Sequence, residues 1–209
     1  MQRIINEDLR PIPIMWRDRL SGFLPRPSKV LLFVVCLIPL ARSLVLSLEA
    51  VNPVEFFTRS TGTWALVALL LTLSITPLRQ LTGYSRLIDY RRMLGLFTFF
   101  YALLHFMTYV WLDQFFDWSA IGQDILKRPF VTVGFAAFVL LIPLAVTSTK
   151  GWMRRLKRNW ARLHRLVYAI AILGVVHYLW LVKADLTTPL IYAAVLAVLL
   201  GWRVLHRVR

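Results

Sequence analysis

The sequence predicts an all-α membrane protein, a bundle of six transmembrane helices with both termini in the cytoplasm. Of its 209 residues 58% are apolar and only 17% are charged, and the mean hydropathy is +0.64, which is too apolar for a soluble domain of this length. Six apolar stretches provide the roughly 20 residues that a membrane-spanning helix needs. They cover about residues 29–48, 62–81, 90–112, 129–148, 161–182 and 189–205. Six spans leave no room for a separate soluble catalytic domain.

The basic residues predict how these helices cross the membrane. Lys and Arg number 25 against 10 Asp and Glu, which gives a net charge of +15. Twenty of the cations lie in residues 1–29, 79–92, 149–165 and 203–209, whereas residues 49–62, 113–128 and 183–188 together hold four. Because Lys and Arg gather on the cytoplasmic side, the charge indicates topology, and no nucleic acid is expected as a partner. We interpret residues 1–28 as a cytoplasmic N-terminal tail and residues 29–209 as one membrane domain in contact with lipid.

The residues that the chain lacks exclude several kinds of chemistry. Its single cysteine, Cys36, excludes an internal disulfide, a CxxC redox pair and a cysteine-held iron–sulfur cluster. No carboxylate lies deep in a predicted span, which argues against a proton pump or a transporter built on buried acids. The sequence shows no repeat with the period of a solenoid or propeller and no inverted repeat of a transporter. Redox chemistry in the spans would therefore depend on histidine.

Two histidines share a depth in the predicted bundle. His105 lies fifteen residues after the expected cytoplasmic start of the third span, and His177 lies sixteen residues after that of the fifth. At 1.5 Å per residue these intervals are about 22 and 24 Å. Two imidazoles that face each other from two helices are what axial ligation of a b-type haem requires. Small residues one turn before each histidine, Ala102 and Gly174, would let a flat macrocycle approach the backbones.

The other histidines allow more than one interpretation. His164 lies thirteen residues before His177, a spacing typical of helices that carry one haem near each membrane face, although an ideal helix turns the two side chains about 140° apart. Thirteen residues before His105 the third span carries Arg92 rather than a histidine. For any single histidine the alternative to haem ligation is an interhelical hydrogen bond. For His164 an interfacial role is the alternative, and His206 is interpreted as part of a solvated basic end.

Eight short segments carry a resemblance to a known family. They are ITPLR at 75–79, RRMLGL at 91–96, LH at 104–105, RPF at 128–130, TST at 147–149, Trp160 with LHRLVY at 163–168, HYLW at 177–180 and PLIY at 189–192. In this order they resemble the MsrQ (YedZ) family, the haem-binding membrane subunits of bacterial periplasmic methionine sulfoxide reductase systems. More broadly the chain is similar to the ferric reductase-like transmembrane domain of ferric reductases, NADPH oxidases and STEAP proteins.

The resemblance implies an electron-transfer subunit of the bacterial inner membrane that binds haem b, one or two per chain, and FMN. It implies electrons from a cytoplasmic flavin reductase or the quinone pool, passed to a periplasmic molybdopterin-dependent methionine sulfoxide reductase catalytic subunit for repair of oxidised proteins. The family's iron-ligating histidines fall on His105, His177 and His164, and Arg92 stands where larger relatives have a fourth. No catalytic residue is expected in this chain, since the sulfoxide chemistry resides in the partner.

Six residues are candidates for binding the FMN phosphate or a haem propionate, because in the basic cytoplasmic segments an anion would meet several charge-assisted donors. They are Arg79, Arg91, Arg92, Trp160, Arg162 and Arg165. The alternative is positive charge that only fixes topology. Two other functions stay open. One is a quinol-linked cytochrome b that serves another acceptor, and the other is a haem-free metal transporter or assembly factor whose histidines bind a transition metal.

Overall fold

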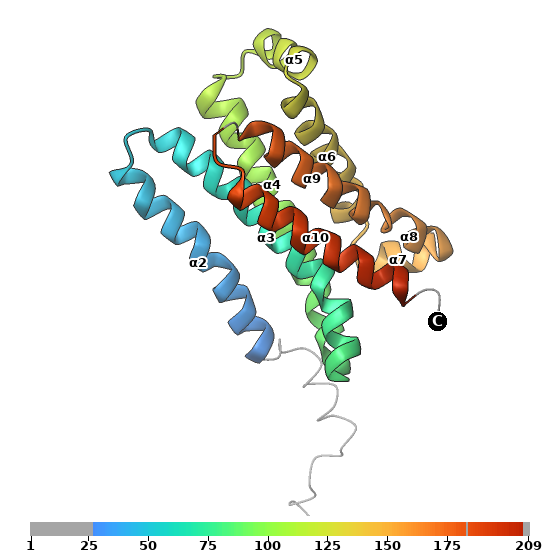
Figure 1. Ribbon diagram of the computed structural model, residues 1–209. Coiled ribbons are helices and arrows are strands. Elements are labelled where there is room, and N and C mark those ends of the chain that lie inside the picture. Colours follow the sequence, from blue (N-terminus) through green and yellow to red (C-terminus); the bar gives the residue numbers. More distant parts are fainter. Residues whose placement is uncertain (1–26, 183, 207–209) are drawn as a thin grey trace, which may run out of the picture. The chain divides into compact units, whose positions relative to one another are not determined.

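The computed structural model describes residues 27–182 and 184–206 (Figure 1). Among these residues it contains helices and no strand, and six helical segments are long and apolar enough to cross a membrane. They are Pro27–Glu49, Pro53–Thr82, Ser85–Asp113, Pro129–Val146, Arg158–Leu181 and Thr187–Leu205. The predicted all-α class with six spans is therefore confirmed. The N-terminal tail predicted at residues 1–28 lies outside the described residues, apart from the first two residues of the first helix.

The helices follow one another without long connections. In chain order they are α2 (Pro27–Glu49), α3 (Pro53–Thr82), the 3₁₀ turn η1 (Ser85–Leu87), α4 (Ile88–Met107), the π-helical turn η2 (Thr108–Asp113), α5 (Trp118–Lys127), α6 (Pro129–Val146), α7 (Lys150–Leu156), α8 (Arg158–Leu163), α9 (Leu166–Leu181) and α10 (Thr187–Leu205). The chain divides into two compact units, Met1–Leu37 and Ile38–Arg209, so α2 contributes to both. In the first unit the described residues form only the beginning of α2. Every other helix belongs to the second unit.

Local sequence explains why the second span begins at Pro53 rather than near residue 62. Asn52 has an extended backbone, and its side-chain oxygen accepts a hydrogen bond from the backbone N–H of Glu55 at 3.1 Å, which is the geometry of an N-cap. Pro53 follows at the first helical position, where the missing N–H breaks no helical hydrogen bond. The first turns of α3 carry Glu55, Arg59 and several hydroxyl side chains among apolar residues, so hydropathy alone places the start too late. At its other end α3 stops at Gly83, whose φ of 68° suits glycine.

The hydrophobic core of the second unit lies among α3, α6, α9 and α10. Leu73 of α3 and Ala171 of α9 are completely buried there, and Ile170 is nearly so. α3 packs most extensively on α4, and α6 packs most extensively on α9. On α10 the guanidinium of Arg203 donates hydrogen bonds to the backbone carbonyls of Leu199 and Leu73, which ties α10 to α3. This packing sets α4 and α9, the two helices that carry His105 and His177, on a common core.

Candidate functional site

His105 of α4 and His177 of α9, together called the histidine pair, lie next to each other. Their ring centroids are 6.1 Å apart, and their ring planes are inclined at 75°. A histidine nitrogen lies about 2 Å from a metal ion that it binds. The ring centroid stands roughly 1 Å farther back, so two imidazoles on opposite sides of one metal have centroids about 6 Å apart. The observed separation therefore suits two axial ligands of a single metal.

One nitrogen of each ring in the histidine pair is held by a backbone carbonyl. The Nδ1 of His105 lies 2.8 Å from the carbonyl oxygen of Thr58 on α3, and the Nδ1 of His177 lies 2.7 Å from that of Phe130 on α6. A carbonyl only accepts, so both Nδ1 atoms carry the hydrogen. Among the described residues neither Nε2 has a hydrogen-bond partner. Each ring is thus fixed in the tautomer whose Nε2 lone pair is free to bind a metal.

Each ring of the histidine pair also lies against a glycine of the neighbouring helix. A Cβ added at Gly62 of α3 would meet Nδ1 and Cε1 of His105 at 3.0 Å, and one added at Gly134 of α6 would meet Nδ1 of His177 at 2.6 Å. Real Cβ atoms essentially never approach another atom to 2.6 Å, and a contact at 3.0 Å requires the ring to shift by a few tenths of an ångström. Glycine at each position therefore lets the histidine ring keep its present place. By contrast Gly174, expected to make room for a macrocycle, faces a leucine side chain of the core.

These contacts repeat along the chain. Each histidine bonds to the carbonyl of the residue 47 positions before it, and in each case the glycine under the ring follows that residue by one helical turn. Thr58, Gly62 and His105 thus correspond to Phe130, Gly134 and His177, with a displacement of 72 residues at all three. The helix pairs α3–α4 and α6–α9 build the same structure twice. The repeat is longer than the periods of solenoids and propellers, and its sequence signal is a glycine 43 residues before each of two histidines.

The donor set of the histidine pair fits haem better than it fits a bare metal ion. Among the residues that the structure describes, no group of three or more His, Cys, Asp or Glu gathers in a way that would hold a metal. Structural zinc sites take four protein ligands, and catalytic ones take three. Two imidazoles suffice when a macrocycle supplies the remaining ligands, as in haem. The two fixed rings and the glycines beneath them therefore fit axial ligation of one haem iron.

His164 is held differently from the histidine pair. It ends α8, and the Trp160 ring stacks on it with centroids 4.0 Å apart and planes inclined at 28°. The Thr147 hydroxyl donates to the carbonyl of Pro143 at 2.6 Å, so it accepts from the Nε2 of His164, which lies 3.1 Å away. The Trp160 indole N–H donates to the Thr147 carbonyl at 2.9 Å. In this arrangement Nε2 carries the hydrogen, which is the reverse of the tautomer in the histidine pair.

The six cofactor-binding candidates do not form one cluster. Trp160 contacts His164, as described above. Arg91 is half-buried and lines a cavity of about 220 Å³ with Thr76, Gln80, Tyr168, Arg203 and His206. The guanidinium of Arg203 lies 5.3 Å above the Tyr168 ring. Sequence alone does not select Arg203 as a candidate, because it lies at a basic helix end that the pattern predicts to be solvated. The remaining four candidates are exposed: Arg79, Arg92, Arg162 and Arg165.

The fold and the histidine pair define a class of multi-pass membrane protein, and comparison with known proteins gives the same class. Residues 61–175 match the family described as ferric reductase like transmembrane component. The match covers most of α3 and all of α4 and α6, and it reaches into α9 just short of His177. No solved structure matches the chain.

Curated relatives identify the family more narrowly. The chain is 60% identical to the protein-methionine-sulfoxide reductase heme-binding subunit MsrQ of Xanthomonas campestris pv. campestris (strain B100) over 156 residues, which cover 75% of this chain and 72% of the relative. It is 55% identical to the subunit of the same name from Bordetella pertussis over 181 residues, 84% of this chain and 88% of the relative. The chain belongs to the MsrQ family. It is accordingly a multi-pass protein of the bacterial inner membrane.

Proposed function

We propose that this chain is the haem-binding, electron-transferring membrane subunit of a periplasmic methionine sulfoxide reductase system. The carrying observation is the histidine pair, with rings 6.1 Å apart and each Nδ1 bonded to a backbone carbonyl. The names of the relatives, heme-binding subunits of protein-methionine-sulfoxide reductase, support the cofactor and the system. Haem b bound there would supply reversible one-electron chemistry, which amino-acid side chains of this bundle lack.

The protein's own contribution would be to hold and orient His105 and His177, the two residues that would bind the haem iron. The carbonyls of Thr58 and Phe130 accept the Nδ1–H groups, so each ring presents its Nε2 without the need to rotate or change tautomer. A hydrogen bond of this kind also raises the basicity of the ligating nitrogen. Because the four supporting groups lie on α3 and α6, and the histidines lie on α4 and α9, the ligand geometry depends on the packing of two helix pairs rather than on a flexible loop.

We propose that electrons enter at the end of the bundle where α3 ends and α9 begins, with both chain termini cytoplasmic on that side. The charge pattern supports this orientation. His164, stacked on Trp160, and the cavity lined by Arg91 and Arg203 lie at that end. The cavity of about 220 Å³ is smaller than the pockets of about 300–1,000 Å³ that enclose whole ligands. It suits the phosphate of FMN, with the flavin ring outside, and a flavin reductase or the quinone pool as the donor.

The acceptor in this proposal is a molybdopterin-dependent catalytic subunit in the periplasm, where the repair of methionine sulfoxide takes place. The connections at the opposite end of the bundle are short, apart from the segment that contains α5 (Trp118–Lys127). The cavity that α2, α3 and α10 line near this end has no histidine, cysteine or carboxylate among its lining residues. Reduction of the sulfoxide is therefore assigned to the partner, and one or two haems in this chain carry the electrons to it.

The decisive experiment measures haem per polypeptide by the pyridine haemochrome assay in detergent-purified protein. His105→Ala and His177→Ala each remove one axial ligand, and we expect haem content to fall to a small fraction of the wild-type value. His206→Ala is the matched control, because this histidine is exposed and stacks on Trp202 at the end of α10. Normal haem content in either of the first two variants would contradict the proposal, as would an equal loss in the control.

The donor is tested separately on the same purified protein. Flavin reductase with NADPH and FMN, or a short-chain quinol, is added anaerobically, and the rate of haem reduction is followed at the Soret band. Fast reduction by the flavin system and slow reduction by quinol would support the flavin route. The opposite result would favour the quinol-linked cytochrome. A purified protein that has no Soret band at all would favour a haem-free function for the histidines.

A further inference from the structure

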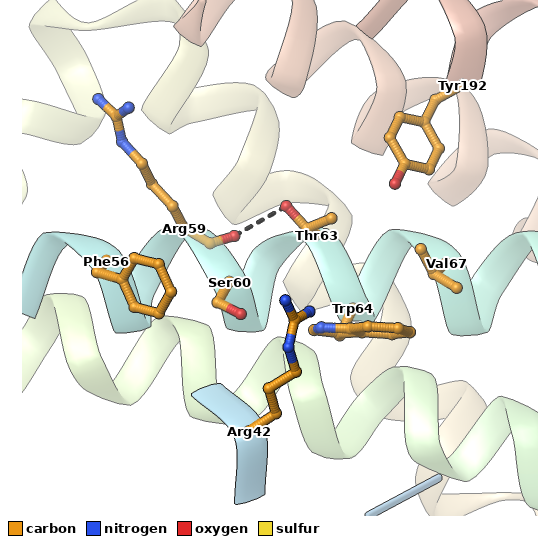
Figure 2. Close-up of a pocket in the computed structure, with 8 residues that line it drawn as sticks. All are labelled: Arg42, Phe56, Arg59, Ser60, Thr63, Trp64, Val67 and Tyr192. Carbon is orange, nitrogen blue, oxygen red and sulfur yellow. Dashed lines mark hydrogen bonds between the residues drawn. The ribbon is translucent and has the colours of Figure 1, made fainter. Parts of the chain in front are cut away.

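A second cavity lies on the other side of α3 from the histidine pair. Its volume is about 450 Å³, and α2, α3 and α10 line it at the end of the bundle where α2 ends and α3 begins. The lining residues are Arg42, Phe56, Arg59, Ser60, Thr63, Trp64, Val67 and Tyr192 (Figure 2). The proposed function makes no use of this cavity, although Thr58, which supports His105, immediately precedes Arg59 in α3.

Hydrogen-bond donors without acceptors gather in this cavity. Among the described residues the Arg42 guanidinium has neither an ion pair nor a hydrogen bond, although it lies within a span, where an unpaired charge is costly. The Trp64 indole N–H and the Tyr192 hydroxyl also have no hydrogen-bond partner in the described part of the chain. Figure 2 shows Arg42 reaching from α2 toward α3, with its guanidinium near Trp64. These groups can all donate to one ligand that carries several acceptor oxygens.

The polar groups that do have partners leave this donor excess unchanged. Arg59 pairs with Glu55 at 2.6 Å, and in Figure 2 its side chain extends away from Arg42. The Thr63 hydroxyl donates to the Arg59 carbonyl at 3.0 Å, and the Ser60 hydroxyl is 2.6 Å from that of Ser43 on α2. No carboxylate lines the cavity. The site is therefore one unit positive and complementary to an anion.

The walls and the depth of the cavity indicate that the anion belongs to an amphiphile. Phe56, Val67 and the Trp64 ring provide apolar walls, and Leu44 and Val45 of α2 nearby in sequence are exposed. α3 has 30 residues, about 45 Å at 1.5 Å per residue, which exceeds the roughly 30 Å hydrocarbon core. Its first turns thus reach the interfacial layer, where lipid phosphates lie and where Trp and Tyr are common.

We propose that this cavity binds the phosphate of an anionic phospholipid, with Arg42, Trp64 and Tyr192 as donors to the phosphate and the apolar wall in contact with the acyl chains. A neutral quinone fits the observations less well, because its carbonyl oxygens would leave the Arg42 charge uncompensated. Inorganic phosphate would satisfy the donors and would gain nothing from Phe56 and Val67. Both are outcomes that the experiment separates from lipid binding.

The experiment uses the full chain in phosphatidylcholine nanodiscs that contain a fixed fraction of phosphatidylglycerol, followed by detergent delipidation and native mass spectrometry of the retained lipid. Arg42→Gln keeps the size and loses the charge, and Tyr192→Phe removes one donor. Arg128→Gln is the control, since Arg128 is an exposed arginine paired with Asp124 at 3.1 Å. We expect retained phosphatidylglycerol to fall about tenfold or more in Arg42→Gln, to fall by a smaller factor in Tyr192→Phe, and to be unchanged in Arg128→Gln.

Three results would overturn this proposal. The first is equal phosphatidylglycerol retention in Arg42→Gln and Arg128→Gln. The second is displacement of the lipid by inorganic phosphate at equal concentration, and the third is displacement by a short-chain quinone that binds Arg42→Gln as well as it binds the wild type. Haem content measured on the same samples is expected to be unchanged, which keeps this test independent of the histidine pair. If Arg42→Gln is recovered unfolded, Tyr192→Phe provides the same comparison.

Discussion

Gly134→Ala is the substitution that tests the geometry of the histidine pair most directly without touching a ligand. The new Cβ would lie 2.6 Å from Nδ1 and 2.8 Å from Cε1 of His177, so the ring must move. The ring is held by a 2.7 Å hydrogen bond to Phe130, and a shift of a few tenths of an ångström weakens that bond. We therefore expect the free Nε2 to leave its position for iron, with loss of haem affinity.

The effect of Gly134→Ala on stability can be worked out from three contributions. Overpacking of a filled interior costs about 1–3 kcal/mol, and loss of the hydrogen bond to Phe130 costs about 0.5–1.5 kcal/mol. Alanine in place of glycine within a helix contributes about 1 kcal/mol in the other direction. The sum is a net destabilisation of about 0.5–3.5 kcal/mol. A Cβ at Gly62 would approach the His105 ring only to 3.0 Å, so Gly62→Ala should have a smaller effect in the same direction.

The assay is haem per polypeptide together with the melting temperature in detergent, measured for both variants and for Gly95→Ala. Gly95 is the matched control because it is a helical glycine of α4 whose added Cβ would meet only Thr72 at 3.8 Å, an ordinary contact. We expect haem content to be highest in Gly95→Ala, lower in Gly62→Ala and lowest in Gly134→Ala. If Gly134→Ala retained full haem and melted no lower than Gly95→Ala, the close packing of His177 on α6 would be refuted as a determinant of the site.

Three further predictions concern the end of the bundle that we propose for electron entry and the topology. His164→Ala should slow haem reduction by flavin reductase with FMN severalfold and leave the low-spin haem spectrum intact. Stopped-flow absorbance measures both. An unchanged rate with unchanged cofactor content would contradict the proposed role of His164. Thr147→Val removes the acceptor of the His164 Nε2–H and should slow the same step less, which the same assay checks against Ser148→Ala as control. A reporter that works only in the cytoplasm should be active when it is fused after Arg209. Activity of a reporter that works only in the periplasm would contradict the predicted topology.

The sequence predicts the neighbourhood of His105 and His177 because a membrane restricts the problem. Helix rise is fixed at about 1.5 Å per residue, so the distance of a residue from the start of a span gives its depth. Rotation about the helix axis and the choice of neighbouring helix are not restricted in this way. Hence the carbonyls of Thr58 and Phe130 could not be assigned as partners in advance, although the depth of the two rings could be predicted.

The boundary of the fifth span illustrates a second limit of hydropathy. A single helix was expected over residues 161–182, whereas the structure divides this region into α8, ending at Leu163, and α9, starting at Leu166. His164 lies at the division. The ideal-helix rotation of about 140° between His164 and His177 therefore does not apply to the actual backbone. Arg162, His164 and Arg165 flank the division, and hydropathy interprets such polar residues as the cytoplasmic start of a span rather than as a break within one.

The repeated structure explains why the two ends of the bundle differ in chemistry. At one end each helix pair, α3–α4 and α6–α9, contributes a glycine, a backbone carbonyl and a histidine in corresponding positions. The two sets face a common centre. The residue that corresponds to His164 in the first pair is Arg92, which is exposed. His164 is already bonded to Thr147 and covered by Trp160. The repeat thus places two histidines face to face at the first end, and its divergence at the second end leaves one histidine beside a basic surface. Under the proposed function, the first end would hold the haem and the second would receive an anionic electron donor.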